Sequence, residues 1–356
     1  MMAFRAAQEY GFVNARIRGM KSRFLTIRDY EELIQAGEYE DFLKTLSGTY
    51  YSSVIGKDWQ REPPMPDELA IMLSRDFADV LQTLSKTLTG RVYEFTQSYL
   101  NMFLAESLKS MIRGVHAGLD ASEILRFAVP ISEDQAATFS ELLELATTVI
   151  DLVESLPYED PKLGLLTRLP AYEEFDSTAP LEVVLEEWFL RTINETLEDF
   201  GEEDQKRVRG ILETRVVLKN ALNMLRALSL GLEDRIVELS MVRFSSEADE
   251  ITASLVETGS EMEVFDVLES TDYKSIGERL RRVYDNTRSL VDVEIALEDY
   301  LAQIVKNQFT LDPFNLGVVY GFFSLKYIEV RNIQSIAVGI ERGEPADVIR
   351  NMITIW

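Results

Sequence analysis

The stretch from Lys326 to Ile353, "KYIEVRNIQSIAVGIERGEPADVIRNMI", decides the fold that the sequence predicts. Its apolar residues recur at steps of three and four, which places them on one face of a helix: Val330, Ile333, Ile336 and Ile340. Gly343 follows, and a glycine at this place readily takes the left-handed conformation that ends a helix. Pro345 then fits the first turn of a new helix. The stretch therefore predicts a long helix, a glycine stop and a short helix.

The same pattern occurs three times along the chain. Superimposing the three stop glycines gives separations of 113 and 112 residues, and the apolar positions before them fall into register: Gly118, Gly231 and Gly343. A second landmark is a glutamate followed by three residues that are apolar or alanine, with separations of 114 and 112 residues: Glu68, Glu182 and Glu294. Polar positions of the repeated helix correspond as well, in the series Glu106, Lys219, Arg331 and the series Ser107, Asn220, Asn332.

Two landmarks with one period indicate three copies of one unit. A repeat of roughly 112–118 residues is far longer than the repeat of a solenoid, so the copies are domains rather than stacked motifs. The chain of 356 residues is long enough for several cores, and helical periodicity dominates over the alternation typical of strands. The sequence thus predicts an all-α fold of three similar helical domains in tandem, at residues 1–130, 131–243 and 244–356.

The charge balance excludes several classes of partner. Lys and Arg number 36 and Asp and Glu 61, which gives a formal net charge of −25. Such a chain repels a phosphate backbone, so nucleic acid is not an expected partner, and the charge also disfavours broad adsorption to anionic lipid. A local contact with a basic loop of a membrane protein remains open.

The reactive side chains of most enzymes are absent from the sequence. There is no cysteine and one histidine, His116, so disulfides, thiol nucleophiles, cysteine-bound metals and serine–histidine pairs are not expected within this chain. Gly56 and Lys57 resemble a phosphate-binding loop only in being adjacent, because the earlier glycine and the following hydroxyl residue are missing. Paired carboxylates are abundant, but they fit solvent faces and first turns of helices. We expect no catalytic residue, no cofactor, no metal and no small-molecule substrate.

The sequence shows no export signal and no membrane span. The N-terminal residues carry scattered charges, and the most apolar stretch, "LGVVYGFFSL" from Leu316, is half of the roughly 20 residues that cross a bilayer. These features favour a cytoplasmic protein. The aromatic residues Phe322, Phe323 and Tyr327 before the third repeat helix are expected in the core rather than on a stacking platform.

Four basic residues on the polar side of the repeated helix are candidate contacts with a partner protein: Arg113, Lys219, Arg226 and Arg331. In an acidic chain they mark a shared surface that faces inward or toward a partner. Ordinary solvated charge explains them equally well at this stage.

Three stretches resemble a known family. "YGFVNARIRGMKSRFL" and "LIQAGEYEDFLKTLSGTYY" near the start, and "EVRNIQSIAVGIERGEPADVIRNMI" at the end, are similar to the C subunit of archaeal A-type (V-type) ATP synthases, the relative of the d subunit of the eukaryotic V-ATPase. The resemblance runs along the whole chain and is looser from 131 to 205. That family has a three-fold internal repetition of helical domains, in agreement with the period above.

The resemblance implies a funnel of three helical domains about a pseudo-three-fold axis. It implies a central-stalk subunit on the cytoplasmic side of the membrane, in one copy per motor, that caps the proteolipid ring and receives the shaft of D and F subunits. Such a protein transmits torque for proton or sodium transport and for ATP synthesis, and it has no catalytic, cofactor or ion site.

Two other functions fit the composition and the periodicity. One is a soluble all-helical scaffold that binds other soluble proteins through a three-lobed surface. The other is a helical enzyme that acts through carboxylates and a magnesium ion, although the chain has no paired signature of the type Asp-Asp-x-x-Asp.

Overall fold

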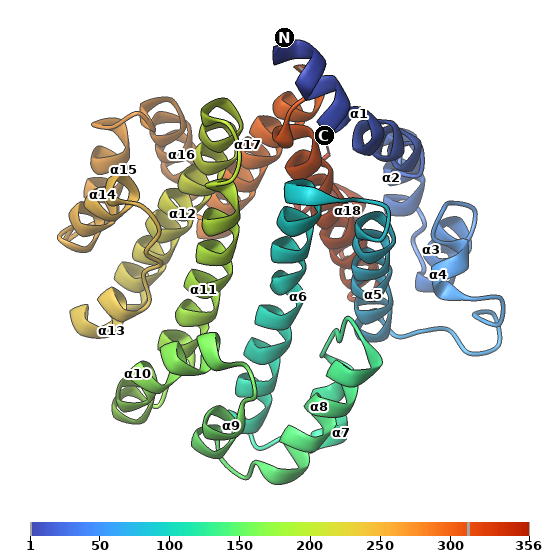
Figure 1. The fold of residues 1–356 in the computed structure, drawn as a ribbon. Helices are drawn as coiled ribbons and strands as arrows, with labels where there is room; N and C mark the ends of the chain where they lie inside the picture. The colour runs from blue at the N-terminus through green and yellow to red at the C-terminus, as the bar shows by residue number, and fades with distance from the viewer. Residues whose placement is uncertain (1, 312–313, 356) are drawn as a thin grey trace. The chain divides into compact units, whose positions relative to one another are not determined.

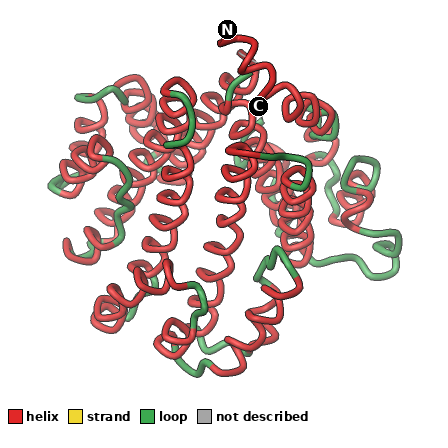
Figure 2. The backbone as a smooth tube through the Cα atoms, viewed as in Figure 1, coloured by secondary structure: helices red, strands yellow, loops and turns green. Residues whose placement is uncertain are grey.

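The computed structural model describes residues 2–311 and 314–355, and within these ranges every regular element is a helix (Figure 1, Figure 2). The all-α prediction is confirmed. The helices are α1 (Met2–Lys21), α2 (Ile27–Ile34), α3 (Tyr39–Leu46), α4 (Ser52–Ile55), α5 (Pro66–Ser85), α6 (Gly90–His116), α7 (Ala121–Arg126), α8 (Glu133–Leu145), α9 (Val149–Ser155), α10 (Glu159–Phe175), α11 (Ala179–Leu197), α12 (Glu202–Leu230), α13 (Asp234–Leu239), α14 (Ser246–Val256), α15 (Glu261–Glu269), α16 (Lys274–Thr287), α17 (Leu290–Leu311), α18 (Leu316–Glu341) and α19 (Ala346–Asn351).

After α1, the order of helix lengths recurs in three sets: α2–α7, α8–α13 and α14–α19. Each set opens with two short helices and a helix of variable length. A helix of 20, 19 or 22 residues follows, then a long helix of 27, 29 or 26 residues, and each set closes with a helix of 6 residues. The sequence boundaries 130/131 and 243/244 fall in the connections between these sets. The division into tandem domains itself stays a prediction.

Packing divides the chain into two compact units, which do not follow the sets. Unit 1 contains residues 1–92 and 298–356, and unit 2 contains residues 93–297. Each unit thus combines helices from more than one set, because a long helix packs against helices of another set.

In unit 1, the long helix α18 packs against α5 and also contacts α1, α2 and α3 (Figure 1). The core of this unit contains Phe322 and Phe323, which are 1% and 0% exposed. The ring of Phe322 stacks on Phe24 at 5.5 Å between centroids. The prediction that these two aromatic residues belong to the core is confirmed, and Tyr327 is half-buried, with the Arg331 guanidinium 5.9 Å from its ring centroid.

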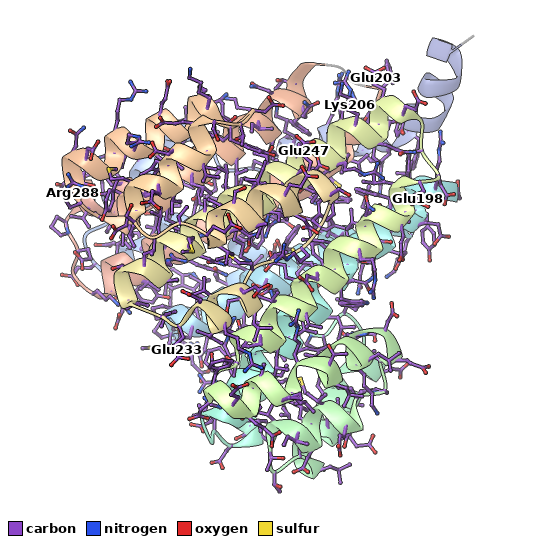
Figure 3. All side chains as sticks on the ribbon, turned by 90° about the vertical axis from the view of Figure 1, so that its left-hand side faces the viewer. Glu198, Glu203, Lys206, Glu233, Glu247 and Arg288 are labelled. Carbon is purple, nitrogen blue, oxygen red and sulfur yellow. The ribbon has the colours of Figure 1, made fainter. Side chains whose placement is uncertain are left out.

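In unit 2, the long helix α12 packs against α14 and α15, and α10 packs against α11 (Figure 1). In both units, then, a long helix packs against the short helices that open a set: α12 against those of the third set, and α18 against those of the first. Charged side chains cover the outside of unit 2, among them Glu203 and Lys206 at the start of α12 and Glu233 beyond its end (Figure 3).

The three long helices end in the same way. The glycines just beyond them have positive φ angles of 71°, 63° and 72°: Gly118, Gly231 and Gly343. In each case the next residue donates its backbone N–H to the carbonyl five residues earlier, at 3.0, 3.0 and 2.9 Å. This is the hydrogen bond that closes a helix with a left-handed residue, a conformation that costs glycine little.

A polar side chain on each long helix is bonded to the backbone 22 residues later. Asn220 exchanges two hydrogen bonds with Val242, at 2.8 and 3.0 Å, and Asn332 exchanges two with Thr354, at 2.7 and 3.0 Å. Ser107, at the corresponding place on α6, accepts one from the backbone N–H at the same separation, at 3.0 Å. These bonds fix the segment that follows each six-residue helix.

The last turn of a long helix also lies close to the short helix after it. A Cβ atom added to Gly339 would lie 2.8 Å from Cγ1 of Ile349, and one added to Gly114 would lie 2.5 Å from Cγ1 of Ile124. In the second set, Ala227 stands at the glycine position and the smaller Val237 at the isoleucine position. The second set thus has a larger residue on the long helix, Ala227, and a smaller residue on the short helix, Val237, so the total volume at the contact is similar, as close packing requires.

Candidate functional site

Two of the four candidate contact residues are paired with two of the glutamates that mark the repeat. Arg113 on α6 binds Glu182 on α11 through two hydrogen bonds, of 2.8 and 2.5 Å. Arg226 on α12 binds Glu294 on α17 at 2.6 Å. The two pairs are equivalent, because each joins the long helix of one set to the helix that precedes the long helix in the next set. The sequence did not indicate that the two groups of residues meet.

The third long helix cannot form another pair of this kind. Val338 stands on α18 at the position of Arg113 and Arg226. Glu68, the first of the repeat-marking glutamates, acts at the start of α5, where its carboxylate accepts the backbone N–H of Met65 at 3.0 Å.

The other two candidate cations form a second kind of pair, within a set. Lys219 binds Glu186, and Arg331 lies 3.0 Å from Glu298. Glu186 and Glu298 are each one helical turn after a repeat-marking glutamate. The four candidate side chains are 54%, 39%, 45% and 43% exposed, in the order Arg113, Lys219, Arg226, Arg331. They are half-exposed and internally paired, so their role in binding a partner stays a prediction.

Glu186 is the centre of a buried charge cluster in unit 2. Its Oε2 lies 3.4 Å from Nζ of Lys109 and also accepts a hydrogen bond from Lys219. Burial by itself would raise the pKa of Glu186, but the charges of Lys219 and Lys109 outweigh it and lower the pKa to about 2. Two ammonium groups around one carboxylate thus keep Glu186 ionised throughout the physiological range.

A second buried charge cluster lies in unit 1, and no pattern in the sequence indicated it. Lys326 and Glu329 on α18 are 3% and 0% exposed. The Glu329 carboxylate accepts hydrogen bonds from the Tyr51 hydroxyl and the Leu25 backbone N–H, both at 2.6 Å. Nζ of Lys326 donates to the Tyr51 hydroxyl at 2.7 Å and lies 3.5 Å from a carboxylate oxygen of Asp76.

Burial dominates the ionisation of this second cluster. It raises the pKa of Glu329, although Lys326 acts in the opposite direction. It also raises the pKa of Tyr51 well above its ordinary range. The Lys326 ammonium lies over two aromatic rings, with the ring centroids of Tyr50 and Tyr51 at 4.9 and 4.5 Å. Because the Glu329 carboxylate is fully buried, it is not available to a substrate. The cluster instead stabilises the packing of α18 against the first set.

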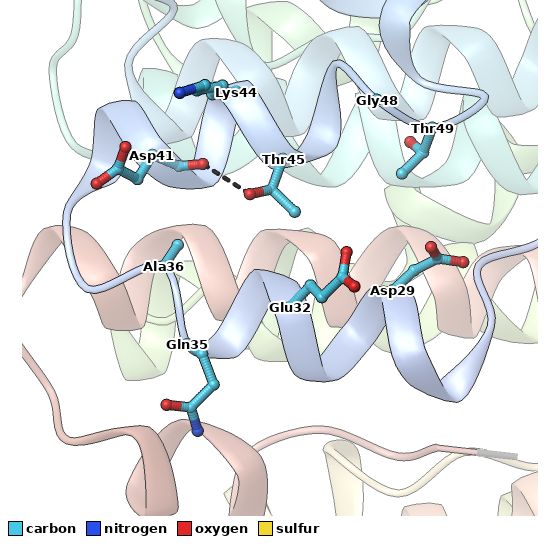
Figure 4. Close-up of a pocket in the computed structure, with 9 residues that line it drawn as sticks. All are labelled: Asp29, Glu32, Gln35, Ala36, Asp41, Lys44, Thr45, Gly48 and Thr49. Atoms are coloured by element: carbon cyan, nitrogen blue, oxygen red, sulfur yellow. Dashed lines mark hydrogen bonds between the residues drawn. The ribbon is translucent and has the colours of Figure 1, made fainter.

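A surface groove between α2 and α3 groups three carboxylates with one lysine: Asp29, Glu32, Asp41 and Lys44 (Figure 4). Two of its acids already have structural roles. Asp29 caps α2 by accepting the backbone N–H of Thr26 at 2.7 Å, and Glu32 pairs with Arg28 at 2.7 Å. We assign no site to this groove.

The remaining predicted features are structural. His116 is exposed, and its Nδ1 lies 3.2 Å from the Tyr172 hydroxyl. In residues 2–311 and 314–355, no three side chains of His, Asp or Glu are grouped so that they could hold a metal ion. Over the same ranges, no helix is both long and apolar enough to cross a bilayer.

Known proteins are similar to this chain over almost its full length. The family model of the ATP synthase (C/AC39) subunit matches residues 13–352. The C subunit of the A-type ATP synthase of Methanocaldococcus jannaschii is 25% identical over 350 residues, which cover 97% of this chain and 86% of the relative. The C subunits of Methanothermobacter thermautotrophicus and Haloferax volcanii are 26% and 25% identical, covering 97% of this chain and 87% and 97% of the relatives. The chain therefore belongs to the ATP synthase (C/AC39) subunit family.

Proposed function

We propose that this chain is the non-catalytic central-stalk subunit of an A-type (V-type) rotary ATP synthase. It acts as a socket that couples the shaft of D and F subunits to the proteolipid ring in the membrane. In this role it transmits torque between the ATP-converting head and the ion-translocating ring, for proton or sodium transport.

The family match over residues 13–352 is the observation that carries this proposal. Relatives named as C subunits of A-type ATP synthases align with 97% of the chain, so the assignment concerns the whole chain and not one module. The cytoplasmic position at the membrane, the partners D, F and proteolipid, and the single copy per motor follow from this role.

The recurring helix order supports an arrangement of three domains, at residues 1–130, 131–243 and 244–356, about a pseudo-three-fold axis in a funnel. A socket on a rotation axis needs similar surfaces around that axis, and tandem copies of one domain supply them from a single chain. The equivalent pairs Arg113–Glu182 and Arg226–Glu294 support the same arrangement, since each joins one copy to the next.

Torque transmission requires stiffness, and three features of the fold supply it. The long helices are closed by the same glycine hydrogen bond, their following segments are tethered by Ser107, Asn220 and Asn332, and both compact units contain a buried charge cluster. Close-packed interiors transmit strain rather than absorb it.

The first experiment is to add the purified, tagged chain to detergent-solubilised membranes whose ATP synthase lacks its own C subunit. We expect recovery of the proteolipid together with D and F, and retention of this set through a salt series that strips weak contacts. Recovery of soluble proteins only, with an assembly-competent C subunit as positive control, would favour the alternative of a soluble helical scaffold.

A charge-swap series then tests the candidate contact arginines. Arg113→Glu with Arg226→Glu breaks both pairs and reverses the surface charge. Adding Glu182→Arg with Glu294→Arg restores the pairs but leaves the arginine positions acidic. If the arginines contact a partner, assembly stays weakened in the fourfold variant. If the swap restores assembly, their role is internal and they are removed from the proposed interface.

A further inference from the structure

The N-terminal helix α1 and the two residues after it are basic in a strongly acidic protein. Residues 2–23 hold five basic residues against Glu9 as the one acidic residue: Arg5, Arg16, Arg18, Lys21 and Arg23. The chain as a whole has a net charge of −25. A concentration of cations in one segment of such a chain requires a local explanation.

Two of these cations, Arg16 and Arg18, have no partner within the described part of the chain. By contrast, Arg23 and Lys21 lie over aromatic rings, with Arg23 at 5.5 Å from the ring centroid of Tyr50 and Lys21 at 4.9 Å from that of Phe309. Arg16 and Arg18 are exposed, and among residues 2–311 and 314–355 neither forms an ion pair or a hydrogen bond through its side chain. They stay unpaired although the protein has 61 acidic residues.

The arrangement of exposed residues around α1 follows a regular pattern. One side packs inward, through the buried residues Tyr10, Val13 and Ile17, and α1 contacts α18. On the opposite side, residues at steps of three and four form an exposed strip without charge: Phe12, Ala15 and Gly19. Phe12 is 55% exposed. With 3.6 residues per turn, Arg16 and Arg18 fall on the two sides of this strip.

We propose that this face of α1, Phe12, Ala15 and Gly19 flanked by Arg16 and Arg18, rests on an anionic lipid surface. Phe12 is the one large apolar side chain on this face, and its ring can enter the acyl boundary of a bilayer while the flanking cations reach the phosphates. The two small residues allow the helix to approach the surface closely.

Charge complementarity favours lipid over the loops of a membrane protein. Cytoplasmic loops of membrane proteins carry an excess of Lys and Arg, which would repel Arg16 and Arg18. The cytoplasmic leaflet has a negative surface potential that attracts them. Because the rest of the chain is acidic, the same potential repels other faces, so the contact orients the molecule as well as holding it. The choice of the cytoplasmic leaflet rests on the proposed coupling role, whereas the contact with anionic lipid can be tested without it.

Vesicle flotation of the full chain tests this proposal without any other subunit. We expect binding to vesicles of phosphatidylcholine mixed with phosphatidylglycerol, no binding to phosphatidylcholine alone, and loss of binding at high salt. Arg16→Glu with Arg18→Glu should weaken binding roughly thirtyfold or more, from about fivefold for each cation near the surface. Phe12→Ser should weaken it too.

Two matched controls make the result decisive. Arg191→Glu with Arg235→Glu changes the net charge equally at exposed positions of unit 2 and should leave binding unchanged. Arg16→Lys with Arg18→Lys keeps the charges and should bind nearly as wild type, since a lipid surface responds to charge rather than to the guanidinium fork.

The proposal is overturned by absence of binding to anionic vesicles, by equal losses in both charge-reversed variants, or by an unaffected Arg16→Glu, Arg18→Glu variant. If vesicle binding is absent while this variant loses D, F or proteolipid in the pull-down, the partner of α1 is an acidic protein surface. In that case the coupling role stands and the lipid assignment falls.

Discussion

Replacing Glu186 by glutamine tests whether the cluster in unit 2 holds three helices together. Glu186 lies on α11 and is 9% exposed, with Lys109 of α6 and Lys219 of α12 as its partners. Glutamine has nearly the same shape but no charge, so it leaves two ammonium groups close together without the anion between them. The change should therefore destabilise unit 2 without creating a cavity.

The pKa of Glu186 gives the expected loss in the free energy of unfolding. It falls from 4.5 to about 2 in the folded protein. At about 1.4 kcal/mol for each pKa unit, the ionised carboxylate contributes about 3 kcal/mol to the free energy of unfolding at pH 7. Removal of one member of a buried ion pair costs about 3–5 kcal/mol in other proteins, which agrees with this figure.

The stability that the Glu186 carboxylate contributes should decrease as the pH falls. Because the folded-state pKa is below the ordinary value, the contribution is fully present above pH 4.5 and is lost as the pH falls toward 2. Glutamine does not titrate. The difference in unfolding free energy between wild type and variant should thus be largest at pH 7 and shrink progressively below pH 4.5.

The measurement has to report on unit 2 by itself, because two compact units can unfold separately. Urea titrations with pulsed hydrogen exchange of peptides from α11 and α12 provide that readout. Glu195→Gln is the matched control on the same helix, since Glu195 is 64% exposed and 3.8 Å from Arg191, and should cost less than about 1 kcal/mol. A loss below about 1 kcal/mol for Glu186→Gln, or one equal at pH 7 and pH 3, would refute the reasoning.

Three further substitutions test the other structural contacts. Gly339→Ala should lower stability by about 1–2 kcal/mol through overpacking, and Ile349→Val in the same chain should restore most of it, as thermal melts would show. Lys326→Met should cost about 3–5 kcal/mol at pH 8 and much less at pH 5, because Glu329, whose pKa burial already raises, can then be protonated; equal losses in urea titrations at both pH values would contradict this. Asn332→Ala removes two hydrogen bonds to the Thr354 backbone and one to the Tyr30 hydroxyl and should cost about 2–4 kcal/mol, with the fastest added exchange at residues around 354.

The helices and their ends could be predicted from the sequence because their causes are local. Apolar spacing determines which face of a helix is buried, and the conformational freedom of glycine determines where Gly118, Gly231 and Gly343 end it. The register between the three predicted copies followed from the same local features. The correspondence of Asn220 and Asn332 was visible in the sequence, but their bonds to the backbone 22 residues later were not.

The charge clusters could not be predicted, because their members come from distant parts of the chain. Lys326 and Glu329 are spaced as an ordinary surface pair on a helix. Nothing near them indicates Tyr51, which lies 275 residues before Lys326 and completes the cluster. Lys219 likewise looked like a surface cation, and only packing shows that it neutralises Glu186. Residues that look solvated in the sequence thus become partners of buried groups when the long helices pack.

Because the long helices have similar apolar patterns, one of them could pack in the place of another during folding. Buried polar contacts favour the correct packing. At the α12–α14 contact, Asn220 donates a hydrogen bond to Thr252 at 2.9 Å, a bond between two uncharged side chains. At the contact of α18 with the first set, Asn332 makes the equivalent bond to the Tyr30 hydroxyl at 3.4 Å, and the buried charged residues Lys326 and Glu329 are added to it. If α18 took the place of α12, the Lys326–Glu329 pair would stay together but would lose the hydrogen bonds of the Tyr51 hydroxyl and the Leu25 N–H, at a cost of about 1–3 kcal/mol or more for each buried charged group left without its partner. The added charged residues therefore distinguish the contact of α18 from that of α12, although the two long helices share their apolar pattern.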